Sequence, residues 1–393
     1  MSSLARLAPG RILAGARWDY RIFKAIKGDN THQSAVFMAE VLPHADVPDP
    51  PKWAMIKTVS PEDTIATENL FREYTSYRLP GVSSAACFRQ IEWLDTTLGE
   101  VRYQHDMRTY ALIKSFLGAA LASCAVIDDQ KHVNTDYKPA NILLSGIETN
   151  RITAKVGDLG LVFPAGDRIN AQPFAMRAPE VFLGQPCTGP SQGWAVAAML
   201  LCWIKPNVLG NADSPHPLVD AAWCMAKIKR LFPDWELPAP DKVDGPVLQA
   251  AVNAARYISR EDPPMQAILP IQEEMQKVKM PQQLRDLLGF MLATNPDKRP
   301  SASAVLESIS FQEFEKVIDV FNKATSKSID DLISDSGEGF KRLTGAIGQD
   351  VKNAAFAKVK ERFESGSLFK DDDMKRMDKL VVTQVDSPQH HPC

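Results

Sequence analysis

Residues 132–160 constrain this chain more than any other part of its sequence. A polar segment that ends at Asn141 leads into the apolar residues 142–144, residues 145–151 have the composition of a turn, and residues 153–157 are typical of a second short strand. Such a hairpin would bring Asp136, Lys138 and Asn141 close to Asp158. Oxygen ligands suit a hard divalent cation, and a lysine offsets the charge of a phosphate. The segment therefore predicts a site for a phosphate group that carries a divalent metal.

Three motifs in and after this segment resemble those of the eukaryotic protein kinases. The family's HRD-x-x-x-x-N, DFG and APE motifs correspond to Asn134-Thr135-Asp136 with Asn141, to Asp158-Leu159-Gly160 and to Ala178-Pro179-Glu180. The resemblance extends from residue 18 to residue 312. It implies an α+β fold with two lobes, a small β-rich N-lobe and a helical C-lobe.

The resemblance also implies which residues would bind ATP and Mg²⁺ and transfer a phosphoryl group. Asp136 would orient the substrate hydroxyl and accept its proton, and Lys138 would steady the moving phosphoryl charge. Lys57 would hold the α- and β-phosphates, with Glu73 as its partner and Glu68 as the alternative. The metal ligands would be Asn141 and Asp158, and the nucleotide would also contact Val36, Glu92, Leu94 and Leu143.

Lys138, two residues after the expected catalytic aspartate, resembles the Ser/Thr rather than the Tyr kinases, and the Thr-Asp-x-Lys-Pro sequence is similar to that of the SR-protein kinases. The implied function is transfer of the γ-phosphoryl group of ATP to Ser or Thr of a protein substrate. The alternatives are a pseudokinase scaffold with weak or no ATP turnover, and a small-molecule phosphotransferase of kinase-like fold. Glu180 is expected to form a structural pair with Arg299.

Several positions depart from the family pattern. Asp29, Thr31 and Ser34 stand where three glycines would let the backbone approach phosphate, which predicts a looser phosphate site. Thr135 replaces the arginine that receives a phosphorylated residue, so activity is expected not to depend on that phosphorylation. Gln192 replaces an aspartate that holds the catalytic-loop backbone, which predicts weaker hydrogen bonds. Residues 74–91 are too few for the expected strands, so one N-lobe strand is expected to be missing.

Local patterns predict individual helices. Residues 60–63 favour a helix start with Ser60 as the cap and Pro61 at the first position, followed by an inward apolar face. That face would consist of Ile65, Leu70, Phe71, Tyr74 and Tyr77. Residues 106–126 predict a long amphipathic helix under the central loop. Residues 194–204 form the longest apolar stretch, too short to span a bilayer, and indicate a buried helix.

Composition limits the class of protein and its surroundings. A net charge of −3 over 393 residues gives no general attraction to nucleic acid, and six scattered cysteines without a C-x-x-C pair fit a reducing compartment. The expected location is the cytoplasm or nucleus, with a mitochondrial presequence at the arginine-containing N-terminus as the lesser alternative.

The expected domains follow from these patterns. They are an N-terminal extension (1–17), a shortened N-lobe (18–94), a C-lobe (95–312), a helical extension (313–369) and a disordered tail (370–393). The helical extension is expected to dock on the core, with binding of a partner helix or a membrane as alternatives. The expected partner is a protein with Ser or Thr, with no nucleic acid and no membrane span.

Overall fold

The computed structural model describes residues 8–15, 18–26, 34–44, 51–88, 94–148, 151–167 and 172–326, with side chains up to residue 318. The chain divides into two compact units. The first consists of Met1–Gln104 with Leu112–Gln312, and the second consists of His105–Ala111 with Glu313–Cys393. The fold is α+β, with small antiparallel sheets and many helices, which confirms the expected class at this level.

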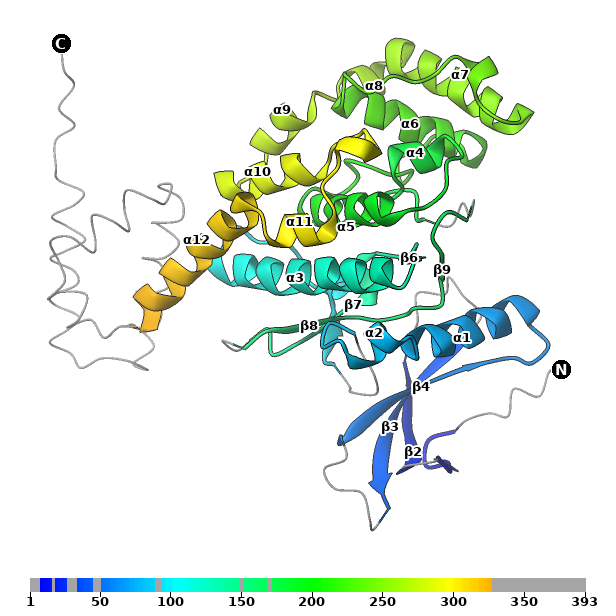
Figure 1. Ribbon diagram of the computed structural model, residues 1–393, viewed down its shortest axis with the longest axis vertical. Helices are drawn as coiled ribbons and strands as arrows, with labels where there is room; N and C mark the ends of the chain where they lie inside the picture. Colours follow the sequence, from blue (N-terminus) through cyan, green and yellow to red (C-terminus); the bar gives the residue numbers. More distant parts are fainter. Residues whose placement is uncertain are drawn as a thin grey trace, which may run out of the picture. The chain divides into compact units, whose positions relative to one another are not determined.

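The N-terminal half of the first unit is built on an antiparallel sheet of four strands in sequential order (Figure 1). Its strands are β1 (Ile12–Leu13), β2 (Trp18–Ile26), β3 (Ser34–Pro43) and β4 (Trp53–Val59). Trp18, Val41 and Ala54 are buried together on this sheet. β1 pairs with β2, so the expectation of a loose extension is wrong for Ile12 and Leu13. Among the described residues, β4 has no strand partner beyond β3.

Helix α1 (Thr64–Tyr77) follows β4 and differs from its predicted orientation. Its N-cap is Asp63, whose side chain accepts a hydrogen bond from the Ala66 N–H, so the predicted cap at Ser60 is wrong. The predicted apolar face is also wrong in part, because Ile65, Phe71 and Tyr74 are 71%, 66% and 55% exposed. The buried positions are Ala66, Glu73 and Ser76. The helix therefore turns a small and polar face inward.

Two smaller sheets position the central loops. β5 (Thr96–Thr97), β7 (Ile142–Ser145) and β8 (Thr153–Val156) form one sheet, and β6 (His132–Asn134) pairs with β9 (Val162–Pro164) in the other. β7 and β8 are antiparallel with Leu143 opposite Lys155, which confirms the predicted hairpin. The polar residues after β6 and the residues after β8 are thereby brought next to each other.

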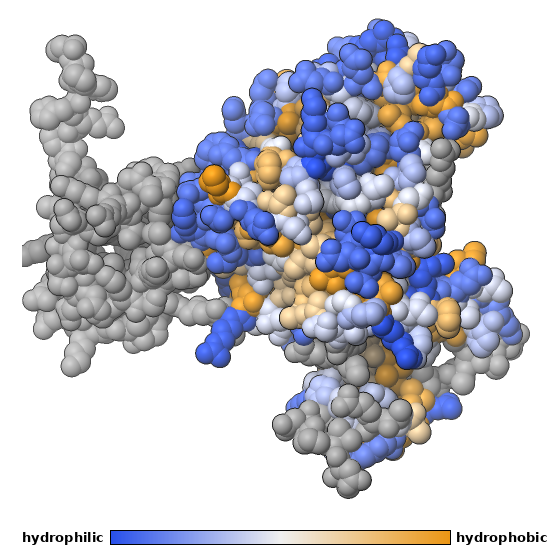
Figure 2. All heavy atoms as spheres, in the orientation of Figure 1, coloured by the Kyte–Doolittle hydropathy of each residue, from blue (hydrophilic) through white to orange (hydrophobic). Residues whose placement is uncertain are grey.

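Helices make up the rest of the first unit. α3 (Met107–Asp129) and α5 (Gly189–Ile204) confirm the helices predicted over 106–126 and 194–204. The others are α2 (Pro80–Ser84), α4 (Pro179–Phe182), α6 (Asp220–Leu231), α7 (Pro246–Glu261), α8 (Pro263–Gln266), α9 (Ile271–Gln276), α10 (Gln282–Met291), α11 (Ala302–Leu306) and α12 (Ile309–Ser326), which continues into the second unit. Hydrophilic side chains cover most of the face in Figure 2, with hydrophobic ones interspersed.

α3 is the one helix in the described part of the chain that is long and apolar enough to cross a membrane. The sequence reasoning did not recognise this property, because Lys114 interrupts the apolar run. Within the protein, 56% of its most apolar 18-residue stretch is buried, as in the core helix of a globular domain. The described residues therefore lack the several spans of a multi-span membrane protein.

The expected helical extension is described only in part. α12 reaches Ser326, and residues 327–393, which include the expected disordered tail, lie outside the described residues.

Candidate functional site

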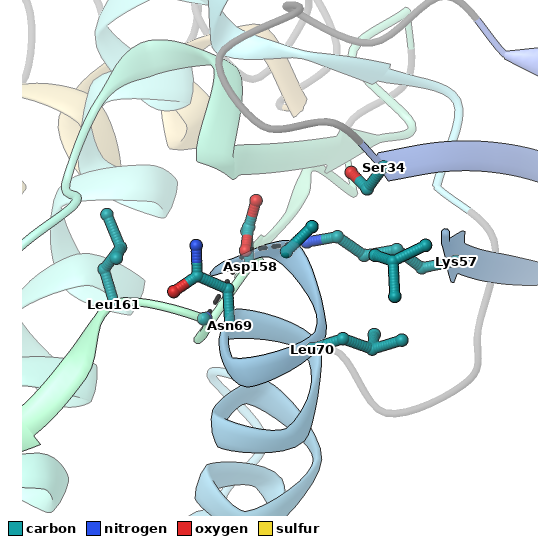
Figure 3. A pocket seen from close by; sticks show the side chains of 9 residues that line it. Ser34, Lys57, Asn69, Leu70, Asp158 and Leu161 are labelled. Carbon is teal, nitrogen blue, oxygen red and sulfur yellow. Dashed lines mark hydrogen bonds and ion pairs between the residues drawn. The ribbon is translucent and has the colours of Figure 1, made fainter. Parts of the chain in front are cut away.

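Lys57 lies in β4 between two carboxylates. Its Nζ is 2.8 Å from Oε2 of Glu73 on α1. It is 3.0 Å from Oδ1 of Asp158 in the loop after β8 (Figure 3). Glu73 is 6% exposed, whereas the alternative partner, Glu68, is exposed to solvent. Three segments far apart in the sequence therefore meet at one ammonium group.

The charge state of Lys57 follows from this environment. Burial lowers the pKa of its ammonium group, but Glu73 and Asp158 outweigh burial, and the pKa is raised above its ordinary value. Lys57 is therefore a fixed cation at neutral pH. A cation held in a partly buried site by two carboxylates can bind a phosphate oxygen without having to be ordered first.

A second cluster surrounds Asp136. The Nδ2 group of Asn141 donates to the backbone oxygen of Asp136 at 2.8 Å and to its Oδ2 at 2.9 Å. Nζ of Lys138 lies 3.1 Å from the same Oδ2. Burial raises the pKa of the Asp136 carboxyl group, Lys138 and Asn141 oppose this rise, and the charge of Asp158 adds to it. A carboxylate with a raised pKa is suited to accept a proton near neutral pH.

The two clusters are neighbours. The Gly157 N–H donates to the backbone oxygen of Asn141 at 2.9 Å, and the negative charge of Asp158 acts on Asp136. Asp158 has a φ of 54°, a left-handed conformation that aspartate tolerates better than most residues do. The structure thus brings Asp136, Lys138 and Asn141 next to the Lys57 cluster, as the hairpin predicts.

A small hollow lies beside Lys57. It has a volume of about 260 Å³ including space open to solvent, and its polar lining comes from Ser34, Lys57, Asn69 and Asp158 (Figure 3). Lys57 and Asp158 therefore both border this hollow.

The residues expected to contact the rest of a nucleotide are not gathered in this hollow. Val36 pairs in register with Lys57, Leu94 is buried and Leu143 is half-buried in β7, but none of them lines it. Glu92 lies outside the described residues, as do Asp29 and Thr31. Ser34, the third of the positions where glycine was expected, is at the hollow.

Oxygen atoms suited to a divalent cation remain in the two clusters. Within the described part of the chain, Oδ1 of Asn141 and Oδ2 of Asp158 accept no hydrogen bond. No group of three His, Cys, Asp or Glu side chains that could hold a metal was found among the described residues. A Mg²⁺ ion here would use the amide and one carboxylate, with phosphate and water oxygens completing its six ligands.

Neutral side chains hold the loop that carries Asp136. Oε1 of Gln192 accepts the Asn134 N–H at 2.8 Å, and Oδ1 of Asn134 accepts the Asp136 N–H at 3.0 Å. The backbone N–H and the hydroxyl of Thr135 both donate to the Leu161 oxygen at 3.0 Å. Gln192 therefore contacts the loop backbone as the resemblance implies, through a neutral oxygen.

No protein-family model matches this chain, and a search of the curated proteins finds no match. The resemblance therefore depends on the motif residues and on how the structure arranges them.

The expected structural pair is present and fully formed. Nη1 and Nη2 of Arg299 donate to Oε1 and Oε2 of Glu180 at 2.7 and 2.9 Å, and both side chains are buried. Arg299 also donates to the backbone oxygens of Ala293 and Pro190. This pair fastens α4 to the segment before α11.

Sequence reasoning missed other residues of the site. Asn69 lines the hollow, Arg72 binds the Asp158 loop, and Tyr137 is fully buried against Ser123 of α3, with their hydroxyl oxygens 2.8 Å apart. Asn69 precedes Arg72 by three residues and Glu73 by four, so it neighbours both on the helix surface. That spacing is the signal that could have identified them.

Proposed function

We propose that this protein is a two-lobed, protein-kinase-like enzyme that transfers the γ-phosphoryl group of ATP to a Ser or Thr hydroxyl of a protein substrate. The observation that supports this most strongly is Lys57, held between Glu73 and Asp158 beside a small hollow. The Asp136, Lys138 and Asn141 cluster lies next to it. A cation for phosphate, a base and oxygen ligands are the groups that phosphoryl transfer requires.

Each residue has one task in this reaction. The hydroxyl oxygen of the substrate forms a bond to the γ-phosphorus while the bond from that phosphorus to the β,γ-bridging oxygen breaks, and ADP leaves. Asp136 orients the hydroxyl and accepts its proton. Lys138 offsets the negative charge of the moving phosphoryl group, and Lys57 holds the α- and β-phosphates. Mg²⁺, when bound by Asn141 and Asp158, supplies further positive charge to the phosphate oxygens.

The chemistry depends on position more than on reactivity. Phosphoryl transfer has little covalent chemistry for a protein to perform, so catalysis comes from holding the reactants in line and from fixed charges. The hydrogen bonds from Gln192 through Asn134 to Asp136 set the base in place. The two short contacts of Lys57 hold in place the ammonium group that binds the phosphates.

A pseudokinase scaffold is the second candidate. Ser34 lines the hollow at a position where glycine would allow a closer approach of backbone to phosphate. This substitution favours a site that binds phosphate but transfers it slowly or not at all.

Transfer of radiolabelled phosphate from ATP to a library of Ser- and Thr-containing peptides distinguishes the two candidates. The full chain with Mg²⁺ is expected to label the library, and Asp136→Ala is expected to reduce labelling by about 100-fold or more. Asp129→Ala, at the exposed end of α3, is the matched control and should leave labelling unchanged. Labelling that survives in Asp136→Ala would refute the proposed function. An unlabelled library with the wild-type chain would favour the scaffold.

A further inference from the structure

Arg72 joins α1 to the loop that carries Asp158. Its Nη1 donates to the backbone oxygen of Gly160 at 2.8 Å and lies 2.8 Å from Oδ1 of Asn69. Its guanidinium carbon is 4.4 Å from the ring centre of Phe163 in β9. One side chain thus contacts the helix, the loop after Asp158 and the strand that follows.

The position of Arg72 on α1 links it to the proposed catalytic groups. Glu73 is the next residue and points to Lys57, which in turn contacts Asp158. A Cβ atom at position 160 would lie 3.3 Å from the backbone oxygen of Asn69, so the loop and the helix are in close contact at this point. A shift of α1 away from the loop would therefore separate Glu73 and Asp158, the two carboxylates that hold Lys57.

Arg72 makes its two hydrogen bonds through Nη1 and its ring contact through the flat face of the guanidinium group. A hydrogen bond from a cation to a carbonyl oxygen is stronger than a neutral one, and the flat guanidinium face is attracted to an aromatic ring. Thr135 holds the same loop from the other side through the Leu161 oxygen.

We propose that Arg72 is a positioning residue that fastens α1 to the 158–160 loop, and so keeps Glu73 and Asp158 on Lys57. The catalytic consequence rests on the proposed function, whereas the fastening itself does not. Arg72 acts through Glu73 and the loop and touches no reacting atom.

Hydrogen exchange of the nucleotide-free full chain tests the fastening without any activity. Arg72→Ala is expected to speed exchange of the amides in residues 158–164 by about tenfold or more, because the loop loses a charge-assisted hydrogen bond and its cation–aromatic contact. Arg72→Lys should give a smaller increase, since lysine keeps the charge but not the flat group. Arg78→Ala is the matched control, because its guanidinium carbon lies 5.2 Å from the ring centre of Tyr74 on the same helix and is exposed.

Unchanged exchange in Arg72→Ala would overturn the proposal. Thermal unfolding of each variant establishes that it is folded. If Arg72→Ala does not fold, Arg72→Lys and Phe163→Leu decide in its place, and unchanged exchange in both would equally overturn the proposal.

The activity measurement separates this proposal from the proposed function. Arg72→Ala is expected to lower kcat by about 10- to 100-fold with a smaller change in KM for ATP, because misplacing Glu73 and Asp158 affects the transition state most. An unchanged kcat in an active enzyme would refute the positioning role. If the wild-type chain transfers no phosphate and Arg72→Ala still speeds exchange, the fastening is supported and the proposed function fails.

Discussion

At the scale of single residues, the pKa of Asp136 reflects burial and two neighbours that oppose its effect. Burial raises its pKa, Lys138 and Asn141 lower it, and the net result is a raised pKa. An aspartate in water titrates near 3.9. In this site the carboxyl group therefore keeps its proton to a higher pH, which places its titration closer to the range in which a base works best.

The pH profile of kcat/KM should reflect this raised pKa. As the pH falls through it, Asp136 becomes protonated and cannot accept the substrate proton, so activity should fall at a pH above the ordinary range of an aspartate. Lys138→Met removes the largest opposing effect and should move this acidic fall to still higher pH. Lys24→Met, at an exposed position of β2, is the control. An acidic fall that stays in place or moves to lower pH in Lys138→Met would contradict the assignment.

The same raised pKa predicts how Asp136 affects stability. A carboxyl group whose folded pKa exceeds its unfolded pKa binds its proton more tightly in the folded state, so its contribution to stability falls as the pH rises through the folded pKa. Asp136→Asn imitates the protonated form and should keep or increase the free energy of unfolding at pH 7, while activity is lost. Urea unfolding of the wild-type chain and of Asp136→Asn measures this free energy of unfolding. A loss of more than about 1 kcal/mol would show that the charged form is the stabilising one.

At the scale of elements, α1 shows where sequence patterns succeed and where they fail. The existence of the helix follows from its acidic start and helical spacing, and Glu73 could be chosen over Glu68 from its position. The buried face could not be predicted, because hydrophobic periodicity assumes an apolar neighbour. Here the neighbours are Lys57 and the 158–160 loop, which select Glu73 and Arg72, and Phe71 is left exposed.

Substitutions on α1 test this orientation. Phe71→Ala should change the free energy of unfolding by less than about 0.5 kcal/mol, because the side chain is 66% exposed. Ala66→Leu should cost about 1–3 kcal/mol, because Ala66 is 4% exposed and a larger side chain overfills the space. Thermal or urea unfolding of both variants gives the comparison. The reverse order of the two effects would mean that α1 is rotated about its axis.

The Glu180–Arg299 pair fastens two helical segments and should dominate their stability. Arg299→Ala should lower the free energy of unfolding by about 3–5 kcal/mol, because it leaves the Glu180 charge buried without a partner. Arg21→Ala removes an ion pair of similar length, 2.8 Å to Glu40, whose side chains are 47% and 40% exposed. That control should cost less than about 1 kcal/mol. Equal losses in the two variants would show that burial of the first pair has no energetic consequence.

At the scale of the whole molecule, the motifs predicted more than the composition did. Asp136, Lys138, Asn141 and Asp158 could be placed together because a hairpin with short strands leaves few arrangements of its ends. Two other features could not be predicted, because both depend on contacts between segments distant in the sequence. They are the pairing of β1 with β2 and the grouping of His105–Ala111 with the residues after 312. The described cysteines are free thiols.

The central claim is that the Lys57 and Asp136 clusters bind one metal–nucleotide complex, and the thermal unfolding of the full chain with ATP tests it most directly. MgATP at 100 times its Kd should stabilise the wild-type chain by about 2.7 kcal/mol, since only the folded state binds it. Lys57→Met should lose this stabilisation, Asp158→Asn should lose its dependence on Mg²⁺, and Asp136→Asn should keep both. No stabilisation of the wild-type chain, or equal stabilisation of Lys57→Met, would contradict the claim.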